Sequence, residues 1–395
     1  MDRFSKAVST PKVALAHDWL TGMRGGEKVL EIFADLFPKA PIYTLLHVPG
    51  SVSEKIESHP IHTSFLQKLP MAEKRYRYYL PFMPALVEGI EIEPVDLVIS
   101  ISSCVVKSVI APVDAKHASY VLSPMRYIYD RYDDYFAADR AGFLTRQAMK
   151  YFRPRLQKWD RRTAKRVDSM MGISSFIADR IRDCYGRSVP VIYPPVEVER
   201  FAVAKRKPDD YYLIVSALVP YKNVDIAIEA FRGLDRKLVV AGAGPLYDKF
   251  KANCPPNVEL RGWVDQVELP DLVAGCRAFL FPQVEDFGIA PVEAMAAGRP
   301  VIALGHGGSL DTVCDVDRFF AGMFRQSLGP TGLFFDKTTP KSLADAVRRY
   351  EQLEHIFDPV QISTWSKRFD RHRFIAEIQN WISSVMNEQQ IRKAA

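Results

Sequence analysis

Short apolar segments alternate with longer amphipathic segments along the first half of this chain. Strands are expected at residues 12–17, 41–46, 95–101 and 118–122, and helices from residue 27 and at 145–166 and 175–185. Uninterrupted apolar segments of about four to eight residues are typical of strands that are buried on both faces. The alternation therefore predicts an α/β domain with a mostly parallel sheet and helices on both of its faces.

A second alternating set follows a segment that cannot be helical. Pro194 and Pro195 exclude helix from the short segment around them, and the polar run KRKPDD follows at residues 205–210. Beyond it, strands are expected at residues 212–216, 237–241, 258–260, 278–281 and 301–303, and helices at 224–232, 245–252 and 292–297. We therefore expect an N-terminal domain over residues 1–204, a C-terminal domain over 205–369 and a final helix over 370–395.

The overall composition is that of a globular protein with two domains. The chain has 395 residues, of which 48% are hydrophobic and 25% charged. Its five cysteines are scattered and form no cluster with histidine, so we expect neither disulfides nor zinc, and a reducing cytosol is favoured. The N-terminus lacks an apolar signal core. The longest apolar stretch, residues 95–112, is too short and too polar to span a bilayer.

The net charge of +6 is concentrated in two segments that also carry aromatic residues. Residues 140–166 contain ten Lys and Arg and a single acidic residue, Asp160, and residues 74–84 read KRYRYYLPFMP. Basic and aromatic side chains together suit an anionic membrane surface. The alternative is a solvated helix whose apolar stripe faces the core. We expect no nucleic-acid binding, because no recognised motif for it is present.

Two glutamates, Glu285 and Glu293, flank a short turn in the segment QVEDFGIAPVEAMAAGRPVIALGHGG at residues 283–308. One carboxylate precedes the turn, and the other is expected on the first turn of the helix that follows. The start of a helix presents unpaired N–H groups and partial positive charge, which can bind hydroxyl and phosphate oxygens. The glutamates can accept hydrogen bonds from sugar and ribose hydroxyls. The arrangement predicts a site for a nucleotide-sugar.

This segment resembles the Glu-x7-Glu signature of glycosyltransferase family 4, whose members are retaining enzymes with the GT-B fold, and bacterial polysaccharide mannosyltransferases in particular. Further matching segments occur in the family's order between residues 12 and 350: MRGGEKVLEIF (23–33), MGISSFIADRI (171–181), VIYPPVEVERF (191–201), LVPYKNVDIAIEAF (218–231), LVVAGAGPL (238–246), LRGWV (260–264) and GLFFDKTTPKSLADAV (332–347). The resemblance implies two Rossmann-like domains facing each other across a cleft, with the C-terminal helix crossing back to the N-terminal domain.

The resemblance also implies roles for individual residues. Glu285 should contact the donor sugar, and the ammonium group of Lys222 should neutralise the diphosphate leaving group. The other implied donor-binding residues are Gly25, Gly26, Gly288, Ile289, Ala290 and Glu293, with Glu293 on the ribose. The candidates for binding the acceptor are His17, Asp18 and Arg126. For Gly25–Gly26 and for His17–Asp18 the alternative is a structural turn.

The implied activity is that of an α-mannosyltransferase in surface-polysaccharide assembly. It would move mannose from GDP-mannose, with retention, to a polyprenyl-diphosphate-linked saccharide at the cytoplasmic face of the membrane. No cofactor and no metal are expected. Asp315-Val316-Asp317 and Asp133-Asp134 resemble a metal-binding DxD motif, but neither has the expected context. Gly242-Ala243-Gly244 lacks the third glycine of a dinucleotide fingerprint and is interpreted as a turn.

Two positions depart from the family's pattern. The arginine that usually stands five residues before Lys222 is Ala217 here, so either another basic residue supplies the second charge or the stabilisation of the leaving group is weaker. The candidates for that charge are Arg126, Arg187 and Arg261. The histidine of the family's Y-x-H-[ST]-P-M-R-Y segment is Leu122 in YVLSPMRY at residues 120–127. These departures motivate one alternative, a non-catalytic partner of a glycosyltransferase complex. A second alternative is a nucleotide-sugar 2-epimerase of the same fold.

Overall fold

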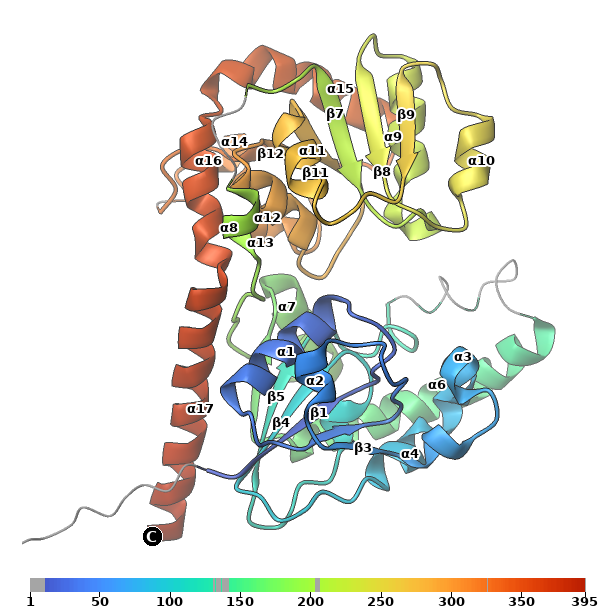
Figure 1. Cartoon of the computed structure of the whole chain (residues 1–395), viewed down its shortest axis with the longest axis vertical. Helices are drawn as coiled ribbons and strands as arrows, with labels where there is room; N and C mark the ends of the chain where they lie inside the picture. Colours follow the sequence, from blue (N-terminus) through green and yellow to red (C-terminus); the bar gives the residue numbers. More distant parts are fainter. Residues whose placement is uncertain are drawn as a thin grey trace, which may run out of the picture. The chain divides into compact units, whose positions relative to one another are not determined.

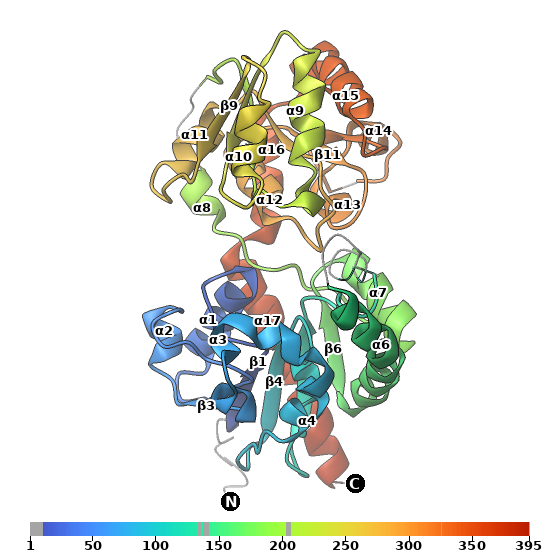
Figure 2. The same ribbon diagram turned by 90° about the vertical axis from the view of Figure 1, so that its right-hand side faces the viewer.

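The computed structural model describes residues 11–130, 132, 136, 142–202, 207–324 and 326–394 (Figures 1 and 2). The chain forms two compact units. Unit 1 comprises Met1–Ile173, Ile177–Ile192 and Ile375–Ala395, and unit 2 comprises Ser174–Phe176 and Tyr193–Phe374. The boundary expected between residues 204 and 205 lies outside the described residues.

Unit 1 is built on a six-stranded parallel sheet with the strand order β3-β2-β1-β4-β5-β6. Its strands are β1 (Val13–His17), β2 (Ile42–Thr44), β3 (Ile61–Thr63), β4 (Leu97–Ser102), β5 (Lys116–Val121) and β6 (Ser169–Gly172). In the central pair, Val13 lies opposite Leu97 and His17 opposite Ile101. Every residue of β1 and β4 is buried, because helices cover both faces of the sheet.

The helices of unit 1 include one that returns from the end of the chain. They are α1 (Gly25–Leu36), α2 (Glu54–Glu57), α3 (Ala72–Arg75), α4 (Met83–Glu88), α6 (Phe143–Thr163), α7 (Ser175–Tyr185) and α17 (Arg371–Ala394), with 3-10 turns η1 (Phe65–Lys68), η2 (Tyr76–Phe82), η3 (Val106–Ser108) and η4 (Ala164–Arg166). In α17, Nε1 of Trp381 donates a 2.8 Å hydrogen bond to Oγ of Ser169 on β6. This contact confirms the prediction that the C-terminal helix returns to the N-terminal domain.

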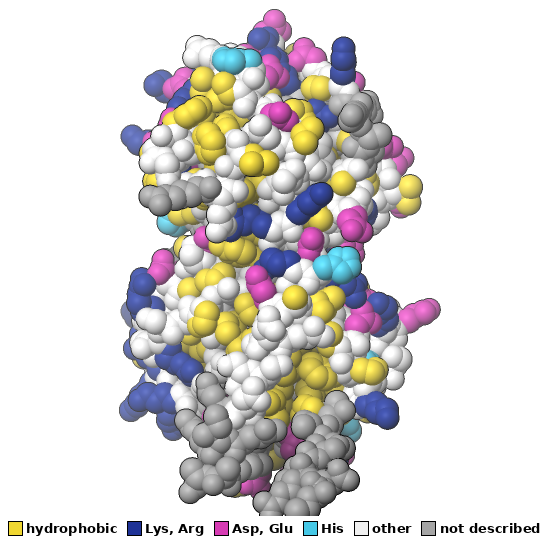
Figure 3. All heavy atoms as spheres, turned by 90° about the vertical axis from the view of Figure 1, so that its left-hand side faces the viewer, with side chains coloured by type: hydrophobic (Ala, Val, Ile, Leu, Met, Phe, Trp, Pro, Cys, Tyr) yellow, Lys and Arg dark blue, Asp and Glu magenta, His cyan; other side chains and the backbone are white. Residues whose placement is uncertain are grey.

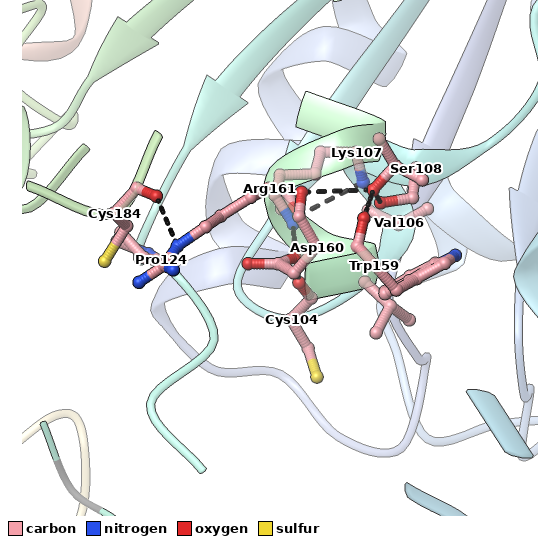
Figure 4. Close-up of polar contacts among 12 residues, drawn as sticks. Cys104, Val106, Lys107, Ser108, Pro124, Trp159, Asp160, Arg161 and Cys184 are labelled. Atoms are coloured by element: carbon pink, nitrogen blue, oxygen red, sulfur yellow. Dashed lines mark hydrogen bonds and ion pairs between the residues drawn. The ribbon is translucent and has the colours of Figure 1, made fainter. Parts of the chain in front are cut away.

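A buried ion pair attaches α6 to the sheet of unit 1. Lys107 in η3 and Asp160 in α6 point toward each other and form an ion pair with both side chains fully buried (Figure 4). Oη of Tyr129 donates a 3.0 Å hydrogen bond to the second oxygen of Asp160. Burial and the neighbouring carboxylate of Asp160 raise the pKa of Tyr129 well above its usual value. The only acidic residue of the basic segment is therefore a buried structural residue.

Unit 2 contains a second six-stranded parallel sheet, with the order β12-β11-β10-β7-β8-β9. Its strands are β7 (Tyr211–Val215), β8 (Lys237–Ala241), β9 (Val258–Gly262), β10 (Ala278–Phe281), β11 (Val301–Leu304) and β12 (Gly332–Phe335). Its helices are α8 (Val198–Phe201), α9 (Val224–Arg232), α10 (Tyr247–Ala252), α11 (Leu269–Gly275), α12 (Ile289–Ala296), α13 (Ser309–Thr312), α14 (Val316–Phe320), α15 (Pro340–Leu353) and α16 (Pro359–Ser366), with 3-10 turns η5 (Pro220–Lys222), η6 (Glu354–Ile356) and η7 (Lys367–Phe369). Two parallel sheets with helices on both faces confirm the predicted α/β architecture.

Three strands were not expected from the sequence, and all three lie at the edge of a sheet. These strands are β3 and β6 in unit 1 and β12 in unit 2. β3 is only three residues long and two of these are exposed, and β6 reads Ser-Met-Met-Gly. β3 and β6 are less buried than the central strands and lack their apolar runs, whereas β12 reads Gly-Leu-Phe-Phe and is mostly buried, with an apolar run of only three residues.

Candidate functional site

The ion pair between Lys222 and Glu285 lies where the strand order of the second sheet reverses. Lys222 ends η5, after β7, and Glu285 lies in the loop after β10; β7 and β10 are neighbours in the sheet. Nζ of Lys222 donates to Oε1 of Glu285, and the two side chains are 17% and 20% exposed. Open α/β sheets bind ligands outside the carboxyl ends of their strands at such a point. The fold thus brings together the two residues that the sequence suggested for catalysis.

Two neighbouring loops hold this pair in place. Nδ2 of Asn223 donates a 3.0 Å hydrogen bond to the carbonyl oxygen of Pro282, which ties the loop after β7 to the loop after β10. Asn223 has a φ of 53°, a left-handed conformation that asparagine tolerates better than most residues. From the loop after β11, the N–H of Gly308 donates a 2.8 Å hydrogen bond to the carbonyl oxygen of Glu285. The backbone on both sides of the pair is therefore fixed by hydrogen bonds.

The helix that follows Glu285 starts earlier than its sequence suggested. It was expected at residues 292–297, but α12 begins at Ile289. Gly288 at the N-cap has a φ of 91°, which is accessible to glycine and lets the chain turn directly into the helix. Pro291 then falls in the first turn, where its missing N–H removes no helical hydrogen bond. As a correction, Glu293 lies on the second turn of α12 and not on the first.

The N-terminus of α12 carries three of the predicted donor-binding residues, Gly288, Ile289 and Ala290. The first N–H groups of a helix have no partner within the helix and favour an anionic or hydroxyl oxygen. Because Gly288 and Glu285 are only three positions apart, this helix start and the ion pair belong to one loop. Glu293 is half-buried on the same helix. The loops after β7 and β10 and the first two turns of α12 therefore carry N–H donors, two carboxylates and one ammonium group in unit 2.

One polar residue of this loop was missed by the sequence interpretation. Gln283 is 3% exposed, and its side-chain oxygen has no hydrogen-bond partner among the residues that the structure describes. Buried polar atoms are paired in the great majority of proteins, so an unpaired one beside a site points to a ligand atom or a water. The only sequence signal was its position two residues before Glu285. Gln283 is therefore an additional candidate for binding the donor.

In unit 1, Asp18 ties the loop after β1 to the loop after β4 by hydrogen bonds. Its carboxylate is not accessible to an acceptor. Asp18 follows β1, and its carboxylate is fully buried. It accepts hydrogen bonds from one hydroxyl and four backbone N–H groups of the loop after β4, at 2.6–3.0 Å: Ser103 N and Oγ, Cys104 N, Val105 N and Val106 N. Both oxygens are thus occupied by the chain itself. This geometry supports the structural alternative for Asp18 over a role in binding the acceptor.

His17 packs against the glycine turn at the start of α1. It is 3% exposed, and its Nε2 lies 3.8 Å from Oε1 of Glu27. A Cβ on Gly26 would lie 3.0 Å from Cδ1 of Leu122 and 3.2 Å from the ring of His17, so a larger residue there would require these side chains to shift. The structure therefore places the predicted residues Gly25, Gly26 and His17 together, with Leu122 against them. They lie at the reversal point of the first sheet, where β1 and β4 are neighbours.

Glu27 was not singled out as a site residue, but it orients this cluster. Burial alone would raise its pKa, whereas the contact with His17 and the N–H groups of Arg24 and Glu27 lower it, and the pKa is below its usual value overall. Oε2 of Glu27 accepts a 3.1 Å hydrogen bond from the N–H of Arg24. This interaction caps α1 and explains why the helix begins at Gly25 instead of residue 27.

Arg126 lies in the loop after β5, at the same edge of the first sheet. It is half-buried, and its Nε donates to Oγ of Ser123 at 3.3 Å. Nη1 of the buried Arg180 donates to the same hydroxyl at 2.9 Å. Two guanidinium groups thus meet at Ser123. Arg126 remains a candidate for binding the acceptor.

Arg187 and Arg261 are the other two candidates for the charge that is missing at Ala217, and each contacts groups other than Lys222. Arg187 donates to the carbonyl oxygens of Ala164, Val167 and Asp168 at 2.6–3.2 Å, so it caps the end of α6 and η4. Arg261 forms a 2.9 Å ion pair with Glu259. It lies on β9, two strands from β7, which is roughly 10 Å at the usual strand spacing. Neither arginine is placed beside Lys222 by these contacts.

The motifs that were set aside as metal or dinucleotide sites have structural roles. Asp315 caps α14 and accepts a 2.8 Å hydrogen bond from the N–H of Phe334, and Asp317 pairs with Arg349 at 2.9 Å. Gly242 packs against the loop after β7, since a Cβ there would lie 1.9 Å from the carbonyl oxygen of Ser216. Asp133 and Asp134 lie outside the described residues. Within the described part of the chain, no three His, Cys, Asp or Glu side chains are grouped to hold a metal.

Comparison with known proteins connects this site to a family. Residues 195–361, which contain the Lys222–Glu285 pair and α12, match the family described as "Glycosyl transferases group 1". Among curated proteins, the chain is 29% identical over 186 residues to "Uncharacterized glycosyltransferase MJ1178" of Methanocaldococcus jannaschii, which covers 46% of this chain and 48% of that protein. It is 24% identical to "O-antigen chain mannosyltransferase RfbU" of Salmonella typhimurium, over 56% of this chain and 61% of that protein.

A third relative has a more specific description. The "GDP-mannose-dependent alpha-(1-6)-phosphatidylinositol monomannoside mannosyltransferase" of Mycobacterium tuberculosis is 29% identical over 218 residues, 47% of this chain and 53% of that protein. The matches to these three relatives span between about half and three fifths of their lengths.

Solved structures share the fold over nearly the whole chain. The crystal structure of Anabaena Alr3699/HepE in complex with UDP has a TM-score of 0.67 at 16% identity and covers 94% of this chain and 100% of that one. The apo form of the lipopolysaccharide outer core galactosyltransferase WaaB has a TM-score of 0.64 at 17% identity, over 94% of this chain and 99% of that one. The fold is therefore GT-B, as expected, while the cleft between its two domains stays a prediction.

Proposed function

Because this chain belongs to the family of group 1 glycosyl transferases, we propose that it moves a hexose from a nucleotide-sugar to a saccharide acceptor with retention at the anomeric carbon. The observation that carries this proposal is the Lys222–Glu285 pair at the reversal point of the second sheet, followed directly by the start of α12. A cation for phosphate, a carboxylate for sugar hydroxyls and a helix N-terminus then lie within one loop system.

In the proposed reaction, the bond between the anomeric carbon and the diphosphate oxygen breaks while the bond to the acceptor oxygen forms on the same face. The departing phosphate oxygen takes the proton of the acceptor hydroxyl. Lys222 stabilises the negative charge that develops on the diphosphate, and Glu285 orients the sugar through its hydroxyls. Glu293 binds the ribose, and the N–H groups of Ile289 and Ala290 bind sugar hydroxyls. Gln283 adds a hydrogen-bond acceptor on the donor side.

We propose GDP-mannose as the donor. Two relatives support this choice by their descriptions as mannosyltransferases, one of them as GDP-mannose-dependent. The competing donor is UDP-glucose, since Anabaena HepE has been crystallised with it.

We propose that the acceptor is a saccharide on a polyprenyl diphosphate, and that the protein meets it at an anionic membrane surface. In the described residues, no helix is both long and apolar enough to cross a bilayer. Unit 1 nevertheless exposes large apolar side chains close to basic ones. Around η1, α3, η2 and α6, those exposed by more than half are Phe65, Met71, Tyr78, Phe82, Phe143, Leu144 and Tyr151. They belong to the region of η1, α3, η2 and α6, in which η2 packs against α6. Such a surface suits insertion at the headgroup level.

The basic side chains of unit 1 are also unevenly distributed. Figure 3 draws the side of unit 1 that carries α17 and not the side of α3 and η2; on it, hydrophobic side chains occupy the middle and Lys and Arg lie toward the edges. Lys150, Arg155 and Lys158 on α6 are exposed. Arg153 is instead half-buried and donates to the carbonyl oxygens of Ile128 and Tyr129 at 2.8 and 3.2 Å. A test of membrane binding should therefore change the exposed residues and leave Arg153 in place.

Vesicle flotation tests the membrane proposal. Wild-type protein should bind vesicles that contain phosphatidylglycerol and dissociate as salt rises, because salt screens the attraction. Each basic residue near such a surface contributes about 1 kcal/mol. Charge reversal of the three exposed α6 residues should therefore abolish most of the binding. The matched control reverses three exposed lysines of unit 2: Lys249, Lys251 and Lys341. Wild-type protein that stays unbound at low salt would contradict the proposal.

A thermal-shift panel of nucleotides and nucleotide-sugars tests the donor. A ligand at one hundred times its Kd stabilises the folded state by about 2.7 kcal/mol, so the melting temperature should rise most with GDP-mannose and GDP. A rise in melting temperature with UDP-glucose alone would identify UDP-glucose as the donor and leave the proposed transfer reaction unchanged. Release of nucleotide that depends on an added saccharide acceptor would exclude the 2-epimerase alternative. A protein stabilised by no nucleotide-sugar would favour the non-catalytic partner.

A further inference from the structure

The two basic and aromatic segments of the sequence contribute walls to one cavity in unit 1. The cavity has a volume of about 450 Å³, within the roughly 300–1,000 Å³ of ligand pockets. η2 and α4 contribute Tyr76, Leu80 and Met83, and α6 contributes Met149. Trp19, from the loop after β1, packs on Tyr76 with ring centroids 4.9 Å apart. These five side chains are at most 8% exposed, so they form a fixed apolar interior.

The same cavity carries basic side chains at its exposed part. Lys74, Arg75 and Arg77 all line it and are exposed to solvent. The guanidinium carbon of Arg77 lies 5.2 Å from the ring centroid of Tyr76, so this cation sits over the apolar wall. Long basic side chains cover apolar surface with their stems and keep their charge in water. An occupant that suits both parts has an apolar chain and an anionic group.

A second observation points to a polar atom of the occupant. Tyr76 is 6% exposed, and its buried hydroxyl has no hydrogen-bond partner among the described residues. Most buried hydroxyls are paired, so an unpaired one on a cavity wall marks a place where a ligand oxygen can bind. A pure hydrocarbon would leave this hydroxyl unpaired, whereas a lipid with a phosphate can pair it.

The position of the cavity connects it to the acceptor candidates. Trp19 is two residues from His17, and Tyr127, which also lines the cavity, follows Arg126 directly. The cavity therefore adjoins the carboxyl edge of the first sheet, where the structure places His17, Gly26 and Arg126. Away from that edge, the walls of the cavity are formed by η2 and α6. These two elements also carry the exposed aromatic residues Tyr78 and Phe143.

We propose that this cavity binds the first part of the isoprenoid chain of a lipid-phosphate acceptor, with the phosphate held by Lys74, Arg75 and Arg77. The proposal rests on the proposed function, since it takes the acceptor to be lipid-linked. A volume in the lower part of the ligand range suits a single isoprenoid chain and not the two acyl chains of a phospholipid.

Calorimetric titration of the full chain with farnesyl phosphate, without donor, tests the cavity itself. Thr145 lines the cavity and is half-buried, so Thr145→Trp should narrow it and weaken binding at least tenfold. The matched control is Leu144→Trp, since Leu144 is 81% exposed and does not line the cavity; it should bind as the wild type does. Equal binding by both variants, or no binding by the wild type, would overturn the proposal.

The two ends of the ligand are tested separately. Arg75→Gln combined with Arg77→Gln changes only exposed residues, so the fold should persist; farnesyl phosphate should bind at least tenfold more weakly, and farnesol should be unaffected. Inorganic phosphate alone should bind far more weakly than farnesyl phosphate. Dihexanoylphosphatidylglycerol that binds as tightly as farnesyl phosphate would assign the cavity to membrane phospholipid and overturn the isoprenoid proposal.

A transfer assay separates failure of this inference from failure of the proposed function. Thr145→Trp should raise the KM for a farnesyl-diphosphate-linked saccharide and leave the KM for the chain-free saccharide unchanged. If wild-type enzyme uses both acceptors with equal KM, the cavity proposal fails while the transferase function stands. If farnesyl phosphate binds as described but no sugar is transferred from any nucleotide-sugar, the function fails while the cavity assignment stands.

Discussion

Lys222 and Glu285 are 63 positions apart in the sequence and form an ion pair in unit 2. They meet because β7 and β10 are adjacent and both loops leave the carboxyl edge of the sheet. The side chains are partly exposed, so water weakens the attraction between them. A diphosphate that binds Lys222 must compete with Glu285 for the same ammonium group. In the proposed reaction, donor binding would therefore be coupled to the orientation of the Glu285 carboxylate.

Restoring the family's arginine tests whether the leaving group lacks a charge. Ala217 lies just after β7, at the same edge as Lys222. Ala217→Arg should raise the transfer rate by about tenfold or more, because one added donor at a developing charge can contribute up to about 10²–10³. The rate is measured with GDP-mannose and a lipid-linked acceptor, with the exposed Ala252→Arg as the control. An unchanged rate would mean that another basic residue already supplies the charge.

Glu293→Gln should mainly weaken binding of the nucleotide. Glu293 lies on the second turn of α12, farther along the chain from the ion pair than the helix start, which fits a contact with the ribose. The loss of one charge-assisted hydrogen bond, about 1.5–3 kcal/mol, corresponds to roughly a tenfold or greater rise in Kd. Titration with GDP measures this rise. The exposed Glu229→Gln on α9 is the control. A Kd equal to that of the wild type would remove Glu293 from the donor site.

The buried pair of Lys107 and Asp160 predicts a large effect on stability. Asp160→Asn leaves a buried ammonium group without its counter-charge, which should lower the free energy of unfolding by about 3–5 kcal/mol. The double variant Lys107→Met/Asp160→Leu should lose less, because neither charge remains. Urea denaturation measures both. Lys55→Gln breaks an exposed pair with Asp35 and should change stability by less than about 1 kcal/mol. A similarly small change in Asp160→Asn would contradict the prediction.

His117 predicts a specific dependence of stability on pH. Its ring is buried on β5 and contacts Oγ of Ser100 at 2.9 Å, and burial lowers its pKa from 6.5 to about 4. The unfolded chain therefore takes up a proton at this residue at higher pH than the folded protein does. The stability that comes from the neutral ring is complete above pH 6.5 and is lost as pH falls toward 4, by about 3 kcal/mol in all.

Comparison with His117→Gln separates the contribution of His117 to the pH dependence of stability from the contributions of the acidic residues, which also titrate. Glutamine stays neutral and can still hydrogen-bond Ser100. Urea denaturation at pH 7 and pH 4.5 should show that the wild type loses about 2–3 kcal/mol more than the variant over this interval. Parallel losses in the two proteins would mean that His117 titrates normally in the folded state.

The sequence predicted the positions of the central strands better than those of the edge strands and of the start of α12. β1, β4, β7, β8, β10 and β11 are buried and apolar, and their positions agree with the expected segments to within a few residues. The edge strands β3 and β6 were not expected because partial exposure permits polar residues in them, and β12 because its apolar run, Leu-Phe-Phe, is only three residues long. The start of α12 was placed three residues late, since the left-handed conformation of Gly288 is set by the loop and not by any periodic pattern.

The site was predictable in its residue types but not in its contacts. Glu285 and Lys222 were indicated by resemblance, whereas their ion pair depends on which strands are neighbours. Asp18 was interpreted as a candidate for the acceptor site because it follows the first strand. Its hydrogen bonds to residues 103–106 come from a loop 85 or more positions away, which no local pattern reveals. Gln283 and Glu27 were missed for the same reason, since burial and tertiary contacts distinguish them.

The most direct test of the whole account is the turnover of Glu285→Gln in a mannosyl-transfer assay with GDP-mannose and a polyprenyl-diphosphate-linked saccharide. Glutamine preserves the shape of the side chain but removes the charge that pairs with Lys222 and orients the sugar. The account predicts a kcat lower by about 10²–10³ with the fold unchanged, while Glu229→Gln on α9 retains the wild-type kcat. Glu285→Gln that transfers mannose at the wild-type rate would contradict the assignment of the active site to the loops after β7 and β10.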